Sequence, residues 1–172
     1  MVDLAAVYTH GLRPKAEGGG ERPELADYRK ACTQAHVSLH VLDLPESRNL
    51  ENHLPAEPFD ILFSLSWRCL LSRAVLDRPR IAAINLHRGA LPTYAGAEPV
   101  RRAIEAGEGR IAITAHRMVE TVDAGEILDA AWLDIGPLPA GLTAADYAEN
   151  IKGRLIPLYA PLARKVIARI VP

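Results

Sequence analysis

Two short and almost entirely apolar runs constrain the fold of this chain more than any other feature. They span residues 61–65 and 81–84, too few residues for a buried helix of ordinary length. Such runs are typical of parallel strands whose two faces are both covered by helices. Apolar residues at helical spacing occur in residues 22–35 and 99–107, so helices are expected there. Alternating strands and helices predict an α/β fold, with a mostly parallel open sheet and flanking helices.

Weaker strand and helix signals occur nearer the two ends of the chain. Further strands are expected at residues 4–8, 37–41, 111–113 and 127–133. The loop between the last two of these strands allows an antiparallel pair at one edge of the sheet. Thr143 followed by Asp146 resembles a capping box, so a helix should begin there. Pro157 is expected to kink or end that helix, and Pro161 to begin a last one.

Length and composition favour one ordinary globular domain. The chain has 172 residues and a formal net charge of −1, without a block of like charge. We therefore expect a single domain over residues 1–172, with C-terminal helices from about residue 143, and neither nucleic acid nor membrane as partner. The N-terminus lacks the basic region of a signal peptide, and Cys32 and Cys69 lie far apart in the sequence. Both features favour a reducing cytoplasm.

Asn85 and His87 follow the apolar run 81–84, at the end of a strand where ligands bind in open α/β sheets. In extended backbone, residues two apart point to the same side, so both side chains should project together. An amide N–H and an imidazole placed there suit the stabilisation of an oxyanion. The alternative is that Asn85 caps the strand and His87 is a loop residue, which is the more frequent outcome for such a pair alone.

Asp123 lies in the loop between the last two expected strands, with Gly125 two residues later. The glycine permits a tight turn, from which the carboxylate could reach the His87 imidazole. A carboxylate at that position favours the imidazolium and fixes the orientation of the ring. The alternative is an ordinary aspartate of a turn.

Two groups of residues together form a specific signature. The first is an Asn-x-His run and the loop after it: Asn85, Leu86, His87, Leu91, Pro92, Tyr94 and Gly96. The second is a strand and the Asp-x-Gly loop after it: residues 114–118 with Asp123, Ala124 and Gly125. Both resemble the signatures of the N-formyltransferases that use 10-formyltetrahydrofolate, and the similarity extends over residues 7–133. It implies a Rossmann-related, formyltransferase-like catalytic domain.

The resemblance implies a role for each of three central residues. Asn85 would hold the formyl oxygen, and His87 would stabilise the tetrahedral intermediate and assist proton movement. Asp123 would orient His87 and could accept the amine proton through a water molecule. The implied reaction transfers the formyl group of 10-formyltetrahydrofolate to a primary amine and uses no metal.

The resemblance also implies two sets of binding residues. One set would line the folate pocket: Trp67, Arg68, Cys69, Leu70 and Leu71. The alternative for Trp67, Leu70 and Leu71 is simple packing, which is at least as frequent for each residue taken alone. The other set would form the loop around the acceptor substrate: Arg88, Gly89, Pro92, Tyr94, Gly96 and His116.

The sequence departs from the family pattern at several points. The family begins with a strand–helix unit before the segment that starts here at Leu4, so a homo-oligomer or a partner chain is expected to complete the sheet. Arg88, Ala95 and Ala124 replace a glycine, an arginine and a threonine of the family signatures. Loss of the arginine at position 95 removes a potential contact with an anionic acceptor.

The acceptor and the class of activity have more than one interpretation. The stretch His116-Arg117-Met118 most resembles the branch that formylates nucleotide-linked amino sugars, so a small amine of that kind is expected. A tRNA acceptor is not expected, because the tRNA-formylating members carry an extra C-terminal β domain, whereas this chain ends in an expected helix. One alternative activity is hydrolysis of formyl-folate. Another is a non-catalytic interaction domain that has retained the site.

Three other clusters have simpler interpretations. His36 and His40 have the spacing of metal ligands on a helix, but the alternation around them indicates a strand, so no metal is expected. Residues 18–20 are three glycines, expected to form a flexible surface loop rather than a phosphate loop. Arg101 and Arg102 are expected to lie on a solvated helix face.

Overall fold

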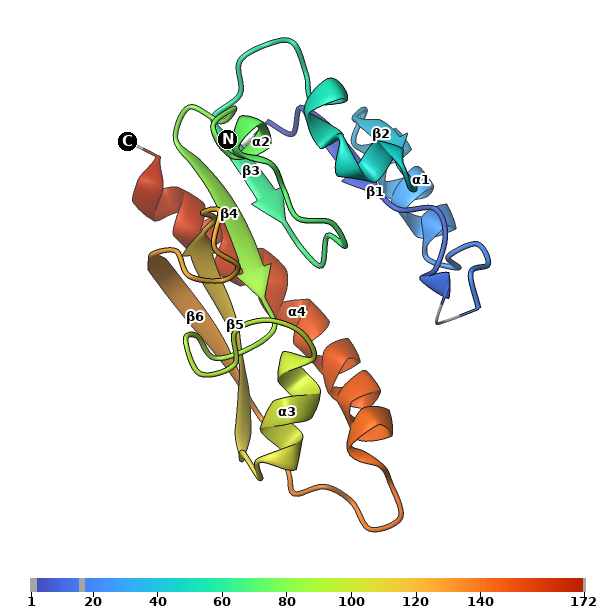
Figure 1. The fold of residues 1–172 in the computed structure, drawn as a ribbon, viewed down its shortest axis with the longest axis vertical. Helices are drawn as coiled ribbons and strands as arrows, with labels where there is room; N and C mark the ends of the chain where they lie inside the picture. Colours follow the sequence, from blue (N-terminus) through green and yellow to red (C-terminus); the bar gives the residue numbers. More distant parts are fainter. Residues whose placement is uncertain (1–2, 16–17, 172) are drawn as a thin grey trace. The chain divides into compact units, whose positions relative to one another are not determined.

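The structure is a computed structural model that describes residues 3–15 and 18–171 (Figure 1). The chain divides into two compact units. The first comprises Met1–Phe59 and Trp67–Arg78, and the second comprises Asp60–Ser66 and Pro79–Pro172. Each unit has its own sheet, and the grouping of residues 1–172 into one domain stays a prediction.

The first unit is built on two parallel strands, β1 (Ala6–Thr9) and β2 (Ser38–Val41). The helix α1 (Leu25–Gln34) connects them and buries Leu25 and Cys32, as the helical spacing predicts. Among the described residues, this unit also contains three short helical segments: η2 (Glu46–Arg48), η3 (Leu50–Asn52) and α2 (Arg73–Leu76).

The second unit contains a four-stranded sheet in the order β3-β4-β5-β6. Its strands are β3 (Ile61–Ser64), β4 (Ala82–His87), β5 (Arg110–Arg117) and β6 (Ile127–Asp134). β3 and β4 are parallel, whereas β4–β5 and β5–β6 are antiparallel. The expected α/β class is confirmed. The sequence allows one antiparallel pair, β5–β6, and the structure has a second one, β4–β5.

The core of the second unit lies between this sheet and two helices, α3 (Pro99–Glu105) and α4 (Ala144–Ile170) (Figure 1). Its centre consists of side chains that are at most 2 % exposed: Ile84, Leu86, Val100, Ile111, Ile113, Ile151, Leu155 and Val166. Burial of one such side chain contributes about 1.5–3 kcal/mol, so this core holds β4 and β5 rigidly in register.

The helix α4 begins where the sequence predicts and continues further than expected. The Thr143 hydroxyl accepts a hydrogen bond from the backbone N–H of Asp146 at 3.1 Å, which caps the first turn. The helix does not end at Pro157 but runs through Pro157 and Pro161 to Ile170, so the expectation of a separate last helix from Pro161 is wrong. Buried residues on either side of the prolines pack into the same core: Ile151, Leu155, Leu162 and Val166.

The edge strand β6 has three backbone groups bonded to side chains rather than to another strand. Arg169 donates to the Leu128 carbonyl at 2.6 Å, and Arg154 donates to the Asp134 carbonyl at 2.9 Å. The Asp129 carboxylate accepts from the backbone N–H of Ala130 at 2.8 Å. These bonds block the addition of a further strand to β6.

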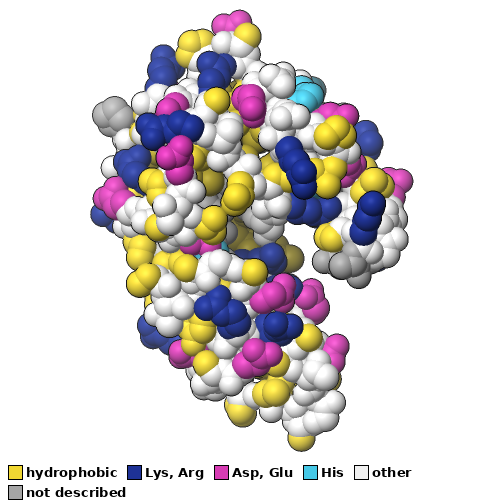
Figure 2. All heavy atoms as spheres, viewed as in Figure 1, with side chains coloured by type: hydrophobic (Ala, Val, Ile, Leu, Met, Phe, Trp, Pro, Cys, Tyr) yellow, Lys and Arg dark blue, Asp and Glu magenta, His cyan; other side chains and the backbone are white. Residues whose placement is uncertain are grey.

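The surface carries no block of one charge on the face that Figure 2 shows, where Lys and Arg side chains are interspersed with Asp and Glu. This agrees with the net charge of −1. Within residues 3–15 and 18–171, no helix combines the length and the apolar character that a bilayer span requires.

Candidate active site

The strand β4 presents Asn85 and His87 on one face of the sheet, while Leu86 between them is 2 % exposed and lies in the core. The antiparallel register pairs Asn85 with His116 and His87 with Thr114 of β5. His116 therefore lies beside the two residues that the sequence selects. The predicted direction of Asn85 and His87 agrees with the structure.

The loop between β5 and β6 brings Asp123 to these strands. Asp123 adopts a left-handed backbone conformation, with φ 52°. Gly125 approaches β5 so closely that a Cβ atom on it would lie 1.9 Å from the carbonyl oxygen of Arg117. Only glycine fits this approach, so Gly125 sets how near the aspartate comes to the strand.

The Asp123 carboxylate contacts both histidines. Its Oδ2 atom lies 3.2 Å from Nδ1 of His87, and its Oδ1 atom lies 3.3 Å from Nε2 of His116. The side chains of Asp123 and His87 are each 8 % exposed. Oδ2 also accepts the backbone N–H of Gly96 at 2.9 Å. The reach of Asp123 to the His87 ring is thus as the sequence predicts.

The His87 ring has an acceptor at each nitrogen. Nε2 lies 2.7 Å from the carbonyl oxygen of Tyr94, and because a carbonyl can only accept, this nitrogen carries a proton. Nδ1 faces the Asp123 carboxylate. The two contacts together fix the orientation of the ring.

The His116 ring is almost fully buried, at 2 % exposure. Burial is the main cause that lowers the pKa of His116, so the ring is neutral at neutral pH and its contact with Asp123 is no ion pair. Nδ1–H donates to the Arg117 carbonyl at 2.9 Å, which leaves a lone pair on Nε2. That lone pair faces the amide nitrogen of Asn85 at 3.3 Å.

The Asn85 amide is shared between two acceptors. Its nitrogen lies 3.3 Å from His116 Nε2 and donates to Asp123 Oδ1 at 3.4 Å. Both distances are long for N–H donors, so these bonds are weak and the amide can exchange one of them for a substrate oxygen at low cost. Asn85, His87 and Asp123 therefore meet at one point.

The loop after His87 is packed tightly against the site. A Cβ atom on Gly89 would lie 2.7 Å from Cβ of Pro99, so only glycine fits there. The Gly89 carbonyl accepts from the Thr114 hydroxyl at 2.7 Å. Pro92 is exposed, and Arg88 acts electrostatically on Tyr159 of α4, whose pKa burial raises and Arg88 lowers.

Arg102 lies in this region, and the expectation of a solvated face is wrong for it. It is half-buried rather than part of a solvated face, and it donates to the carbonyls of Ala95 and Ala97 at 2.7 and 3.3 Å. No sequence signal identifies it, because its partners are backbone atoms of an irregular loop. Thr114 could have been found, since it lies two residues before His116 on the same face.

The predicted folate-binding residues belong to the first unit. The Trp67 ring stacks on His10 at 4.3 Å between centroids, and Arg68 donates to the Leu12 carbonyl at 2.6 Å. Cys69 contacts Ser47 at 3.5 Å, Leu71 is half-buried and Leu70 is 78 % exposed. His10 is a second buried histidine, and burial is the main cause that lowers its pKa.

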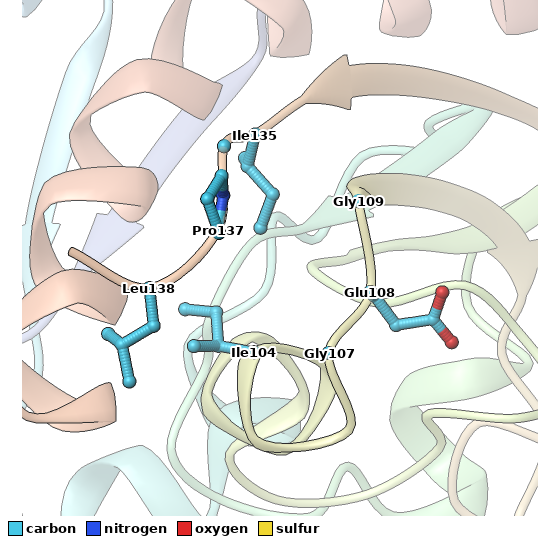
Figure 3. A pocket seen from close by; sticks show the side chains of 8 residues that line it. Ile104, Gly107, Glu108, Gly109, Ile135, Pro137 and Leu138 are labelled. Carbon is cyan, nitrogen blue, oxygen red and sulfur yellow. The ribbon is translucent and has the colours of Figure 1, made fainter. Parts of the chain in front are cut away.

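The second unit has a hollow near the C-terminal end of α3 (Figure 3). Its lining is mainly apolar: Ile104, Gly107, Glu108, Gly109, Ile135, Gly136, Pro137 and Leu138. The Glu108 carboxylate points away from the apolar side chains in Figure 3 and accepts the Tyr94 hydroxyl at 2.7 Å. The hollow contains no predicted site residue, so the polar cluster around Asp123 is the better candidate site.

Solved structures of formyltransferases share the fold of this chain. The glycinamide ribonucleotide transformylase 1 of Symbiobacterium toebii aligns with a TM-score of 0.66 at 21 % identity, covering 80 % of this chain and 65 % of that protein. The formyltransferase PseJ of Anoxybacillus kamchatkensis, solved with UDP-4,6-dideoxy-4-formamido-L-AltNAc and tetrahydrofolate, aligns with a TM-score of 0.55 at 20 % identity, covering 94 % and 78 %. These likenesses confirm the Rossmann-like fold.

Sequence comparison assigns the family. The methionyl-tRNA formyltransferase of Pseudomonas fluorescens (strain SBW25) is 34 % identical over 168 residues, which are 96 % of this chain and 50 % of that protein. That of Wigglesworthia glossinidia brevipalpis is 34 % identical over 112 residues, 64 % of this chain and 35 % of that protein. The chain thus spans half or less of the length of these relatives. The formyl transferase family model matches residues 11–152, and the chain therefore belongs to the formyl transferase family.

Proposed function

We propose that this chain transfers a formyl group from 10-formyltetrahydrofolate to a primary amine. The observation that carries the proposal is the Asp123 carboxylate, which lies 3.2 Å from Nδ1 of His87 with one oxygen and accepts from the Asn85 amide with the other. Family membership supports the same chemistry. Asn85, His87 and Asp123 are its proposed catalytic residues.

Each of the three residues has a task that its contacts suit. The donor supplies the formyl group. The Asn85 amide would exchange a 3.4 Å bond to Asp123 for one to the formyl oxygen. His87 would stabilise the negative charge that develops on that oxygen, and Asp123 would receive the amine proton through water. The amine nitrogen forms a bond to the formyl carbon, and the bond from that carbon to N10 of the donor breaks. The proton taken from the amine is passed on to N10, so that tetrahydrofolate leaves.

The segment Trp67–Leu71 is the proposed binding site for the folate ring. Leu70 is 78 % exposed, and the buried indole nitrogen of Trp67 has no hydrogen-bond partner among the described residues. An exposed apolar side chain and an unused donor both suit a flat heterocycle with polar edges. Leu70→Asp should raise the KM for the donor and leave kcat nearly unchanged. A KM equal to that of wild type would contradict this site.

The proposed acceptor is the amine of a nucleotide-linked amino sugar. Its support is the stretch His116-Arg117-Met118 and the fold shared with PseJ, which was solved with a UDP-linked sugar. The curated relatives are methionyl-tRNA formyltransferases, so methionyl-tRNA is the competing acceptor to test. The protein is given equal amounts of an amino-sugar nucleotide or of methionyl-tRNA in separate reactions. The acceptor that becomes formylated faster decides between the two.

A further strand from another chain, or from a second copy of this chain, is proposed to pair with β3. β3 is the edge strand of its sheet and, within the described residues, pairs with β4. By contrast, side chains block β6 at the opposite edge. Light scattering on the purified chain should give a mass above one chain, or its cellular partner should co-purify with it.

Formation of tetrahydrofolate from 10-formyltetrahydrofolate tests the proposed activity directly. The reaction is followed with purified protein in the presence and absence of candidate amines. Turnover that requires the amine supports the transferase. Turnover without any amine indicates a hydrolase, and an absence of both turnover and folate binding indicates an interaction domain.

A further inference from the structure

The orientation of the His87 ring depends on the loop that follows it. Nε2 of His87 donates to the Tyr94 carbonyl at 2.7 Å, while Nδ1 lies 3.2 Å from the Asp123 carboxylate. The carbonyl is thus the nearer of the two acceptors. Because this carbonyl belongs to a loop without a helix or strand, its position must be fixed by other contacts.

Arg102 of α3 supplies contacts of this kind. Its guanidinium donates to the Ala95 carbonyl at 2.7 Å and to the Ala97 carbonyl at 3.3 Å. The same group lies 5.8 Å from the centroid of the Tyr94 ring, within the range of a cation–π contact. One planar cation therefore holds both the ring of Tyr94 and the backbone that follows it.

Glu108 anchors the other end of the Tyr94 side chain. The Tyr94 hydroxyl donates to Glu108 at 2.7 Å, and the backbone N–H of Tyr94 donates to the Ala90 carbonyl at 2.8 Å. Glu108 is itself exposed, and its carboxylate points away from the apolar side chains of the hollow in Figure 3. Arg102 and Glu108 thus fix the Tyr94 side chain from two sides. Of the two, only Arg102 also binds backbone carbonyls of the loop.

We propose that Arg102 is a positioning residue for His87, which it orients through the backbone carbonyl of Tyr94. Arg102 contacts the loop and not the three proposed catalytic residues. Its effect on turnover rests on the proposed function, whereas its effect on the His87 ring does not. The two effects are therefore measured separately.

Arg101→Ala is the matched control for Arg102→Ala. Arg101 is the neighbouring residue on the same helix, is exposed and pairs with Glu105 at 3.5 Å. Each variant removes one positive charge from α3, but only the Arg102 variant removes the bonds to the loop. Both carbonyls accept from the single Nη1 atom of Arg102. Arg102→Lys is the second test variant, because the shorter lysine side chain does not reach the position of Nη1 and has no planar group to lie beside the Tyr94 ring.

Nuclear magnetic resonance of the histidine rings in the free protein is the first measurement. The Nε2–H proton of His87 should exchange with water about tenfold faster in Arg102→Ala than in wild type, the factor expected for loss of one ordinary hydrogen bond. Arg101→Ala should match wild type. The Nδ1–H of His116, bonded to the Arg117 carbonyl, is the internal reference and should keep its exchange rate in every variant.

Turnover is the second measurement. In Arg102→Ala, kcat should fall roughly 10- to 100-fold while the KM for the formyl donor changes less than about twofold, as expected for a misplaced catalytic group. Arg102→Lys should show an intermediate kcat. Arg101→Ala should keep the kcat of wild type.

Equal His87 exchange rates in Arg102→Ala and Arg101→Ala would overturn the proposal, whether or not the protein transfers formyl groups. A wild-type protein without turnover contradicts the proposed function and leaves the exchange experiment decisive. If Arg102→Ala does not fold, Arg102→Lys decides, and a wild-type exchange rate for His87 in that variant overturns the proposal.

Discussion

The Oδ2 atom of Asp123 lies 3.2 Å from Nδ1 of His87, and both side chains are 8 % exposed. The other carboxylate oxygen faces His116 and the Asn85 amide. One buried carboxylate thus organises polar groups from two neighbouring strands before any substrate binds. Such a preorganised cluster can stabilise charge in a transition state without reorganising.

Replacing Asp123 by Asn should abolish most of the activity. The amide cannot balance a positive charge on His87, so kcat should fall roughly 10³- to 10⁴-fold, as for the carboxylate of a hydrolase triad. Steady-state rates at saturating donor and amine measure this. Glu126→Gln is the control, because Glu126 follows in the same loop and forms an exposed ion pair with Arg117. A similar loss in both variants would show that Asp123 has no special role.

Replacing Gly125 by Ala should displace Asp123 and destabilise the loop. The new Cβ would lie 1.9 Å from the Arg117 carbonyl, which no side-chain movement relieves. Gly153→Ala is the control, because a Cβ on this exposed glycine of α4 meets no atom within 4 Å. It should raise the free energy of unfolding by about 0.5–1 kcal/mol. Chemical denaturation should give a lower free energy of unfolding than wild type for Gly125→Ala and a higher one for Gly153→Ala.

The sequence predicts the elements that local pattern alone determines. The runs 61–65 and 81–84 correspond to β3 and the start of β4, because strands covered on both faces need apolar residues throughout. Asn85 and His87 share a face because the period of a strand is two residues. The meeting of His87 with Asp123 follows from the family signature and agrees with the structure.

Features that depend on tertiary packing could not be predicted. Pro157 signals a helix end, yet the packing of Leu155 and Leu162 keeps α4 continuous. Arg102 binds carbonyls of a loop whose path no local pattern specifies. The roles of the site residues and the acceptor stay predictions.

Stability should fall in mild acid in part because of His116. Burial lowers its pKa, so the unfolded chain takes up this proton at a higher pH than the folded protein. The stability that the neutral ring contributes is complete at neutral pH and is lost as the pH falls below about 6.5, the unfolded value. His116→Gln should therefore show a shallower decline of the unfolding free energy between about pH 7 and 5. Parallel curves for the variant and wild type would refute this. His10, whose pKa burial also lowers, is present in both proteins and contributes equally to both curves.

Removing the cap of α4 should cost about 1 kcal/mol of stability. Thr143→Ala loses the acceptor for the backbone N–H of Asp146, a bond of 3.1 Å. Thr143→Ser keeps the hydroxyl and should unfold at nearly the same denaturant concentration as wild type. An alanine variant as stable as the serine variant would show that the cap contributes nothing.

The most direct test of the central claim is transfer of a labelled formyl group. 10-Formyltetrahydrofolate carrying a ¹³C formyl carbon is incubated with the purified protein and an amine acceptor, and the acceptor is analysed by mass spectrometry. We predict a formylated amine that carries the label in wild type and almost none in Asp123→Asn. Labelled formate without labelled amine, or equal labelling by both proteins, would contradict the assignment of a formyl transfer that depends on Asp123.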